Sequence, residues 1–223
     1  MWLEEALRGL RLDQEMEEYL LGRGGPPELI KAMGLVTWEQ LSVDVPYDDF
    51  CAKYGRRGEG LVGALITPLY SPRSRLLGFE ARSIRKKKLS RFVLPEANWN
   101  PVWIGIREAM PKIWAGGTVW VVEGIFDLFA MRRIIPKRDA VLSSLQARLT
   151  DNHLQFISRF VPTVNMVYDR DEAGRRATKR GMFRLRQLGV PCRDLVYSGG
   201  KDPGQIWEER GEDVLRETFA IYL

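Results

Sequence analysis

The feature that most constrains the fold is a regular alternation of short apolar runs with longer amphipathic segments, which begins at Thr118. The expected strands cover residues 119–122, 140–145, 163–168 and 193–197. The expected helices cover residues 126–134, 151–160, 172–188 and the chain from 203 onward. Strands that alternate with helices pair in parallel, because the helix supplies the crossover connection. This half of the chain is therefore expected to form a mainly parallel sheet flanked by helices.

The first half of the chain follows a different pattern. Residues 2–21 place apolar side chains at helical spacing among acidic ones, and a second helix is expected over residues 28–33, with Gly34 at its end. From Gly60 onward, apolar runs are separated by turn residues. This pattern predicts antiparallel hairpins, one of them with a basic tip at residues 85–88.

Together these patterns predict a mixed α/β (α+β) fold in two parts. A basic helical and β-hairpin subdomain is expected over residues 1–115, and the sheet domain with its C-terminal helices over residues 116–223. Since the sequence has no apolar run long enough to span a bilayer, we expect no membrane contact and a cytoplasmic location. Two cysteines and one histidine are too few for a tetrahedral site of Cys and His ligands, so no zinc is expected.

Lysine and arginine are concentrated in one segment of the chain. Residues 1–50 contain 4 Lys or Arg and 11 Asp or Glu, whereas residues 51–115 contain 13 and 4. A basic patch attracts polyanions such as nucleic acid, although a merely solvated surface has the same composition. Trp99, Trp103 and Trp114 lie in this segment and could stack on bases. We expect them instead in the core or at a domain junction, because tryptophan is usually buried.

The helix expected over residues 172–188 is also rich in basic side chains. One side of it contains Arg175, Arg176, Lys179, Arg180 and Arg184. We interpret this side as a solvated face, unless nucleic acid reaches it.

Acidic residues follow three of the expected strands. Glu123 and Asp127 follow the first strand, Asp169 and Asp171 the third, and Asp202 the last. Taken singly, each is most simply a helix N-cap or first-turn residue. The carboxyl ends of parallel strands meet at one edge of a sheet, however, so these side chains are expected to converge. Because converging carboxylates repel one another unless a cation joins them, the sequence predicts a magnesium site at this edge.

The acidic positions belong to longer runs that resemble a known family. These runs are Val121-Val122-Glu123-Gly124, Asp169-Arg170-Asp171-Glu172-Ala173-Gly174-Arg175 and Lys201-Asp202-Pro203. They resemble the TOPRIM fold of topoisomerases and primases, and most closely the DnaG-like bacterial primases. Further similar stretches are Arg23-Gly24, Gly78-Phe79-Glu80-Ala81-Arg82 and Leu149-Thr150 with His153. We interpret His153 as a helix-start residue rather than a catalytic base.

The resemblance, which covers about residues 15–210, implies a primase catalytic core that synthesises short RNA primers on single-stranded DNA. It implies that Glu123, Asp169 and Asp171 act in catalysis and that, with Asp127 and Asp202, they bind Mg²⁺ or Mn²⁺. The implied contacts to template or triphosphate are Arg82, Lys86, Lys87, Lys88, Arg91 and Lys201. The implied partners are single-stranded DNA, nucleoside triphosphates, and a replicative helicase or a zinc-binding protein in trans, in a bacterial, phage or plasmid system.

The chain also departs from the family pattern. Gly204 stands where a further aspartate is usual, residues 62–64 lack the usual arginines, and residues 99–105 lack the usual lysine. We expect neither the family's zinc-binding domain nor its helicase-binding domain in this chain, which fits an excised core or a naturally short version. Two alternatives stay open: a TOPRIM nuclease that uses water as the nucleophile, and a non-catalytic relative that binds single strands. A topoisomerase is disfavoured because no tyrosine lies in a recognisable nucleophile domain.

Overall fold

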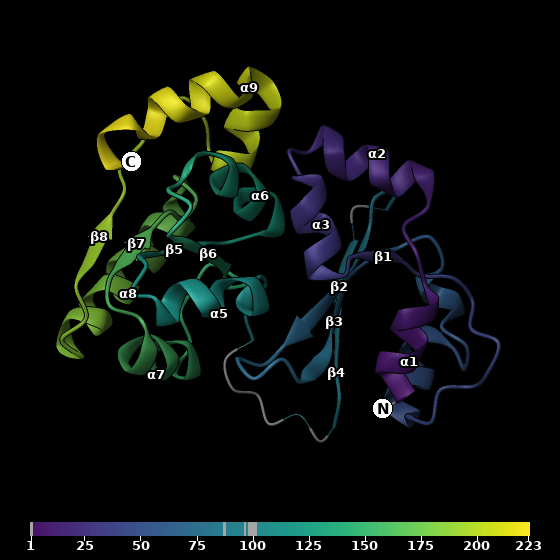
Figure 1. Ribbon diagram of the computed structural model, residues 1–223. Helices are drawn as coiled ribbons and strands as arrows, with labels where there is room; N and C mark the ends of the chain where they lie inside the picture. The colour runs from purple at the N-terminus through teal and green to yellow at the C-terminus, as the bar shows by residue number, and fades with distance from the viewer. Residues whose placement is uncertain (1, 87, 96, 98–101) are drawn as a thin grey trace.

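The computed structural model describes residues 2–86, 88–95, 97 and 102–223 and contains two separate four-stranded sheets (Figure 1). The first sheet has the order β1 (Val36–Thr37), β2 (Leu65–Tyr70), β3 (Leu76–Ser83) and β4 (Lys88–Val93), and every pair in it is antiparallel. The hairpins predicted from the turn residues are therefore confirmed. The two-residue strand β1 was not predicted, because it is too short to show a period in the sequence.

Four helices accompany the first sheet: α1 (Trp2–Gly9), α2 (Gln14–Gly22), α3 (Pro27–Met33) and α4 (Asp48–Tyr54), with a 3₁₀ turn at Glu59–Leu61. The segment 2–21 forms two helices rather than one, because Asp13 starts a new helix by accepting a hydrogen bond from the Met16 N–H at 2.7 Å. Gly34 ends α3 in the left-handed conformation, with φ +68°, as the sequence predicted.

The first sheet packs on an aromatic cluster. Phe50 of α4 is fully buried, and its ring lies 5.8 Å from that of Trp38, 6.3 Å from that of Phe79 and 5.2 Å from that of Phe92. Aromatic side chains bury large areas, so this cluster supplies much of the apolar surface that stabilises the N-terminal half. The acidic segment of the chain is thus attached to the basic hairpins by an apolar core.

The second sheet has the strand order β6 (Ala140–Ser143), β5 (Val119–Val122), β7 (Val164–Met166) and β8 (Cys192–Asp194). All of its pairs are parallel, as the alternation of strands and helices predicted. Its helices are α5 (Ile106–Trp114), α6 (Ile125–Ile134), α7 (Asp151–Phe160), α8 (Glu172–Gln187) and α9 (Pro203–Phe219), which is followed by a 3₁₀ turn at Ala220–Tyr222.

Helices cover both faces of the second sheet (Figure 1). Trp120 and Val122 belong to the same core as the apolar side chains of α6 and α9, whereas Val119 and Val121 belong to a second core with α5, α7 and α8. Successive residues of a strand point to opposite faces, so a central strand with both faces covered is apolar throughout. The core on the α6 side is continuous with the core of the first sheet, which joins the two halves of the chain.

The tryptophans of the basic segment differ in how far they are buried. Trp103 is fully buried in the core of the second sheet, as expected, and Trp99 lies outside the described residues. The prediction for Trp114 was wrong: it is the last residue of α5 and is 70% exposed, at the edge of the buried stripe rather than within it. Within the described ranges, no helix is both long and apolar enough to cross a membrane.

Candidate active site

A groove of about 380 Å³ lies at the carboxyl ends of the parallel strands, between the two halves of the chain. The second half lines it with Glu123, Asp127, Asp169, Lys201 and Asp202, among other residues. The first half contributes Arg23, which ends α2, together with Glu80 and Arg82 of β3. The structure therefore brings four of the five predicted carboxylates into one groove, and basic side chains from the other half face them.

Glu123 follows β5 directly and is close to Asp169. Its Oε1 accepts a hydrogen bond of 3.2 Å from the backbone N–H of Asp169. Burial, and next the negative charge of Asp169, raise the pKa of Glu123 to about 7, although the hydrogen bond and Lys201 act in the other direction. Glu123 is thus a carboxyl group that exchanges a proton near neutral pH when no cation is bound beside it.

Asp127 lies in the first turn of α6 and is 8% exposed. Its Oδ2 accepts a hydrogen bond of 3.1 Å from the N–H of Gly124, and its Oδ1 accepts one of 3.1 Å from the N–H of Gly204. Burial and the nearby charges of Asp202 and Asp169 raise its pKa well above the usual value. A Cβ at position 204 would lie only 3.2 Å from Asp127 Oδ1, so the missing aspartate leaves room for this contact.

Asp169, Asp171 and Lys201 form an ion-pair cluster. The Lys201 Nζ lies 2.9 Å from Asp169 Oδ2 and 3.3 Å from Asp171 Oδ2. Asp171 is also the N-cap of α8 and accepts a hydrogen bond of 2.9 Å from the Gly174 N–H, which is the main reason that its pKa is lowered. Burial, by contrast, raises the pKa of Asp169. Lys201 therefore neutralises part of the negative charge at this edge.

The donor set at this edge consists of carboxylate oxygens, which are the ligands that Mg²⁺ and Mn²⁺ prefer. Among the residues that the structure describes, no three carboxylate, imidazole or thiol groups enclose a point as closely as a preformed metal site does. Burial, and after it the charges of neighbouring carboxylates, raise the pKa of Glu123, Asp127 and Asp169, and a bound divalent cation would relieve the repulsion among them. The chemistry of the donors therefore fits the ion, and its binding would compete with Lys201 for Asp169.

The predicted basic residues divide between two places. Arg82 lines the groove, and its guanidinium lies 5.1 Å from the centre of the Phe126 ring. Arg91 forms an ion pair of 3.1 Å with the buried Glu80, which also lines the groove. Lys86 and Lys88 line a different cavity at the tip of the first sheet, together with Lys53, and Lys87 lies outside the described residues.

Sequence reasoning assigned no role to two groups of groove residues. Arg23 lies with its guanidinium 4.4 Å from the centre of the Phe126 ring and pairs with Glu208 at 2.5 Å. The match of Arg23-Gly24 to the start of the primase core was the signal that could have singled it out. Ser143, the last residue of β6, and Gln146, which follows this strand, also line the groove, but neither stands in a motif.

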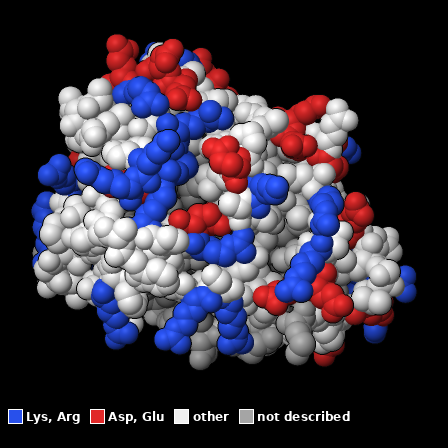
Figure 2. Space-filling model, viewed as in Figure 1, with Lys and Arg blue, Asp and Glu red and all other residues white. Residues whose placement is uncertain are grey.

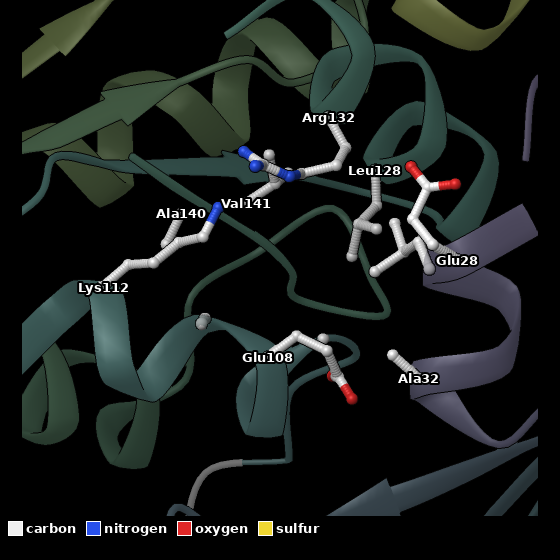
Figure 3. Close-up of a pocket in the computed structure, with 11 residues that line it drawn as sticks. Glu28, Ala32, Glu108, Lys112, Leu128, Arg132, Ala140 and Val141 are labelled. Atoms are coloured by element: carbon white, nitrogen blue, oxygen red, sulfur yellow. The ribbon is translucent and has the colours of Figure 1, made fainter. Parts of the chain in front are cut away.

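A second cavity, of about 230 Å³, lies between α3, α5, α6 and β6 (Figure 3). The nitrogen atoms of Lys112 and Arg132 lie on one side of it, and the carboxylates of Glu28 and Glu108 lie on the other. Both cations donate to the backbone oxygen of Asp139, at 3.0 Å and 3.2 Å. None of the predicted site residues lines this cavity, so it is not the candidate active site.

Charge on the outer surface is distributed in patches. On the face shown in Figure 2, acidic side chains gather over α9 at the top, and a band of Lys and Arg side chains lies below them. The basic surplus of residues 51–115 therefore does not make this whole face basic.

Comparison with known proteins places the chain among relatives of one kind. Residues 120–206 match the family model described as Toprim-like. The DNA primase of Aquifex aeolicus is 31% identical over 159 residues, which are 70% of this chain and 32% of the relative. The DNA primase of Pseudomonas aeruginosa is 26% identical over 97% of this chain and 36% of its own length. The chain thus spans about a third of the length of these curated relatives.

Solved structures agree in fold. The zinc-binding and RNA polymerase domains of the Aquifex aeolicus primase match with a TM-score of 0.75 at 23% identity, over 98% of this chain and 59% of that one. A DnaG primase catalytic domain bound to single-stranded DNA matches with a TM-score of 0.71 at 19% identity, over 93% of this chain and 71% of that one. In sequence and in fold, this chain belongs with the DnaG-like primases and contains a TOPRIM domain.

Proposed function

We propose that the chain is the nucleotidyl-transferring core of a DNA primase and extends short RNA primers on single-stranded DNA. The observation that carries the proposal is the groove in which Glu123, Asp127, Asp169 and Asp202 from one half face Arg23 and Arg82 from the other. Carboxylates on one wall and guanidinium groups on the other suit a substrate that is both metal-bound and rich in phosphate. The DNA primase relatives support the same activity.

Each wall of the groove has a part in this proposal. The guanidinium groups of Arg23 and Arg82 both lie over the Phe126 ring, which limits the motion of their charged ends, so they can orient a triphosphate or template phosphate. The Arg82 Nε is buried and has no hydrogen-bond partner among the described residues. Phosphoryl chemistry depends mainly on positioning and charge neutralisation, and these two side chains supply both.

The carboxylates would hold the metal. Glu123, Asp127, Asp169, Asp171 and Asp202 are the proposed ligands of Mg²⁺ or Mn²⁺, and a bound ion would supply charge neutralisation at the transferring phosphate. Lys201 pairs with both Asp169 and Asp171. If these carboxylates held a metal ion, the ammonium group of Lys201 would need another anionic partner, which the phosphates of the incoming nucleotide would supply.

The proposal is tested by primer synthesis. The protein is incubated with single-stranded DNA, ribonucleotides and Mg²⁺ or Mn²⁺, beside an Asp169→Ala/Asp171→Ala variant and an Asp213→Ala variant. Asp213 is an exposed carboxylate of α9 outside the groove, so its variant is the matched control. Oligonucleotide products that disappear only in the double variant support the proposal.

Two other results would refute primer synthesis as the function of this chain. Metal-dependent cleavage of the template without synthesis would assign a nuclease. Single-strand binding without either reaction, and without a metal requirement, would assign a binding protein. Deoxyribonucleotides in a parallel reaction establish which sugar the groove accepts.

A further inference from the structure

Helix α8 has an unusual excess of positive charge. Within Glu172–Gln187 it contains one acidic residue and six basic ones, namely Arg175, Arg176, Lys179, Arg180, Arg184 and Arg186. All six are exposed, whereas Ala177, Met182 and Leu185 face the core of the second sheet. We define the outer face of α8 as Arg176, Lys179, Arg180 and Phe183, which lie opposite the buried stripe at helical spacing.

Neighbouring acids compensate only part of this charge. Arg176 pairs with Glu172 on the same helix, and Arg184 pairs with Asp151 of α7 at 2.6 Å. Within the described part of the chain, no carboxylate lies within ion-pair distance of Lys179, Arg180 or Arg186. Basic residues three and four positions apart on a helix repel one another, so the face costs folding stability in the isolated protein.

The helix dipole explains only the basic residues at the C-terminal end of α8. Cations stabilise the last turn of a helix, which accounts for Arg184 and Arg186. Arg175 and Arg176 stand in the first half of α8, where the same dipole disfavours positive charge. The pair with Glu172 accounts for Arg176, but neither the dipole nor an ion pair accounts for Arg175, Lys179 or Arg180, whereas binding of a polyanion would give these charges a partner.

An exposed aromatic ring lies within the basic face. Phe183 is 63% exposed and stands one helical turn after Lys179 and Arg180. Surfaces that bind single-stranded nucleic acid combine cations, which neutralise the backbone, with aromatic rings, on which bases stack. A ring in the middle of a basic stripe therefore favours a single strand over a duplex, whose bases are already stacked.

Two segments place α8 next to the groove. Asp171, at the groove edge, is the N-cap of α8, so the helix starts at the candidate active site. The segment after β6 lines the groove with Gln146, and then exposes Arg148. Its next residue, Leu149, packs beside Gly181 on the buried side of α8, so this segment lies next to the helix but does not reach its outer face. At 1.5 Å per residue α8 is about 24 Å long, so a strand that leaves the groove could run along it for roughly seven stacked nucleotides.

We propose that the outer face of α8 is a second binding surface for single-stranded DNA, used by the part of the strand that extends beyond the groove. The inference rests on the proposed function, because the groove is taken as the place where the strand starts. It predicts that strand length decides whether α8 contributes to binding.

The test compares two variants of equal charge. Lys179→Glu/Arg180→Glu reverses two charges of the outer face, and Lys137→Glu/Arg138→Glu reverses two exposed charges of the turn before β6, which does not line the groove. Phe183→Ala removes the ring without changing charge. Fluorescence anisotropy with labelled oligothymidylates of about six and about twenty nucleotides, at increasing KCl, gives affinity and its salt dependence for each protein.

For the long strand, we expect Lys179→Glu/Arg180→Glu to weaken binding at least about tenfold and to reduce the salt slope by about 1.4, which corresponds to two lost phosphate contacts. Phe183→Ala should weaken binding several-fold with an unchanged slope. The short strand should bind all variants equally well, and the control variant should bind both strands as the parent protein does, apart from a small general charge effect.

Equal affinity of the α8 and control variants for the long strand would overturn the inference. An equal loss for a duplex of the same length would overturn the assignment to single strands. Primer synthesis is measured on the same preparations. If the parent protein makes no primers but the α8 variants lose affinity for the long strand only, the proposed function is refuted and the second surface is supported. If the parent protein makes primers and the α8 variants show no such loss, the proposed function is supported and the second surface is refuted.

Discussion

Protonation of His153 is expected to destabilise the folded protein in mildly acidic solution. The ring is 3% exposed and lies 4.2 Å, centre to centre, from the ring of Trp103. Its Nδ1 accepts a hydrogen bond of 3.2 Å from the N–H of Thr150, and its Nε2 lies 3.0 Å from the carbonyl oxygen of Val102. A neutral imidazole with its proton on Nε2 satisfies both contacts. A protonated ring would turn a second N–H toward the Thr150 N–H, where one donor would face another.

The size of the effect follows from the pKa of this histidine. Burial lowers the pKa of His153 from 6.5 to about 4; repulsion from Arg91 adds to this, and the Val102 carbonyl opposes it. Between these two values the unfolded chain binds a proton that the folded chain does not bind, so stability is lost as the pH falls. The loss in free energy of unfolding is about 2 kcal/mol near pH 5 and approaches about 3 kcal/mol near pH 4.

Two measurements check this prediction. His153 is the only histidine of the chain, so its ring proton resonances in NMR titrate without overlap from another residue. Urea unfolding of the parent protein and of His153→Gln, near pH 7 and near pH 5, separates this group from the carboxylates, since these titrate in both proteins. The parent should lose about 2 kcal/mol more than the variant. A His153 pKa at or above 6.5, or an equal loss in both proteins, would refute the reasoning.

Two stability predictions concern the first sheet. Gly78→Ala would place a Cβ 2.2 Å from the Phe92 carbonyl oxygen on the paired strand, so we expect a loss of roughly 2–4 kcal/mol in urea unfolding. Gly22→Ala, where nothing lies within 4 Å of the added atom, should be close to neutral, and equal effects at the two glycines would contradict the argument. Phe50→Ala should cost about 3–5 kcal/mol, because its ring contacts several others in the aromatic cluster; a loss below about 1 kcal/mol would show that the cluster is not tightly packed.

The strands and helices of the second sheet were predictable because the sequence shows both the short apolar runs of buried strands and the helical spacing of the segments between them. Apolar runs such as 119–122 are buried on both faces, and the segments between them have helical spacing. The order of the strands was not predictable, because it depends on which strands pair across long stretches of chain. The boundary expected between residues 115 and 116 stays a prediction, and α5, which precedes it, packs in the core of the second sheet.

Helix α5 shows where local reasoning fails. No helix over residues 106–114 was predicted from the sequence, and the segment contains Pro111, a residue type that usually disfavours a helix interior. Packing decides its conformation, because Ile106, Met110 and Ile113 are buried against the second sheet. Likewise, nothing in the local sequence distinguishes Trp103 from Trp114, of which only the first is buried.

The acidic residues could be located from the sequence, but their contacts could not. Their position after the strands was sufficient to predict that they meet at one edge. The pairing of Lys201 with Asp169 and Asp171 was not predicted, since it depends on the conformation of the long segment after β8. Arg91 likewise was assigned to the template or triphosphate, which stays a prediction, and the structure places it in an ion pair with Glu80.

The two interpretations of the acidic residues, as helix caps and as site ligands, are compatible in this fold. Asp171 and Asp202 each cap a helix with one carboxylate oxygen, and Asp127 accepts N–H groups from both Gly124 and Gly204. Backbone N–H groups at helix N-termini stabilise negative charge, and the bond from Gly174 is the main reason that the pKa of Asp171 is lowered. At Asp127, burial and the charges of Asp202 and Asp169 outweigh its hydrogen bonds and raise the pKa well above its usual value. The same hydrogen bonds fix the orientation of the side chains before any ligand binds. Glu123, Asp127 and Asp169, whose pKa values are raised by burial and by neighbouring carboxylates, are therefore the carboxylates whose charge depends most on a bound cation.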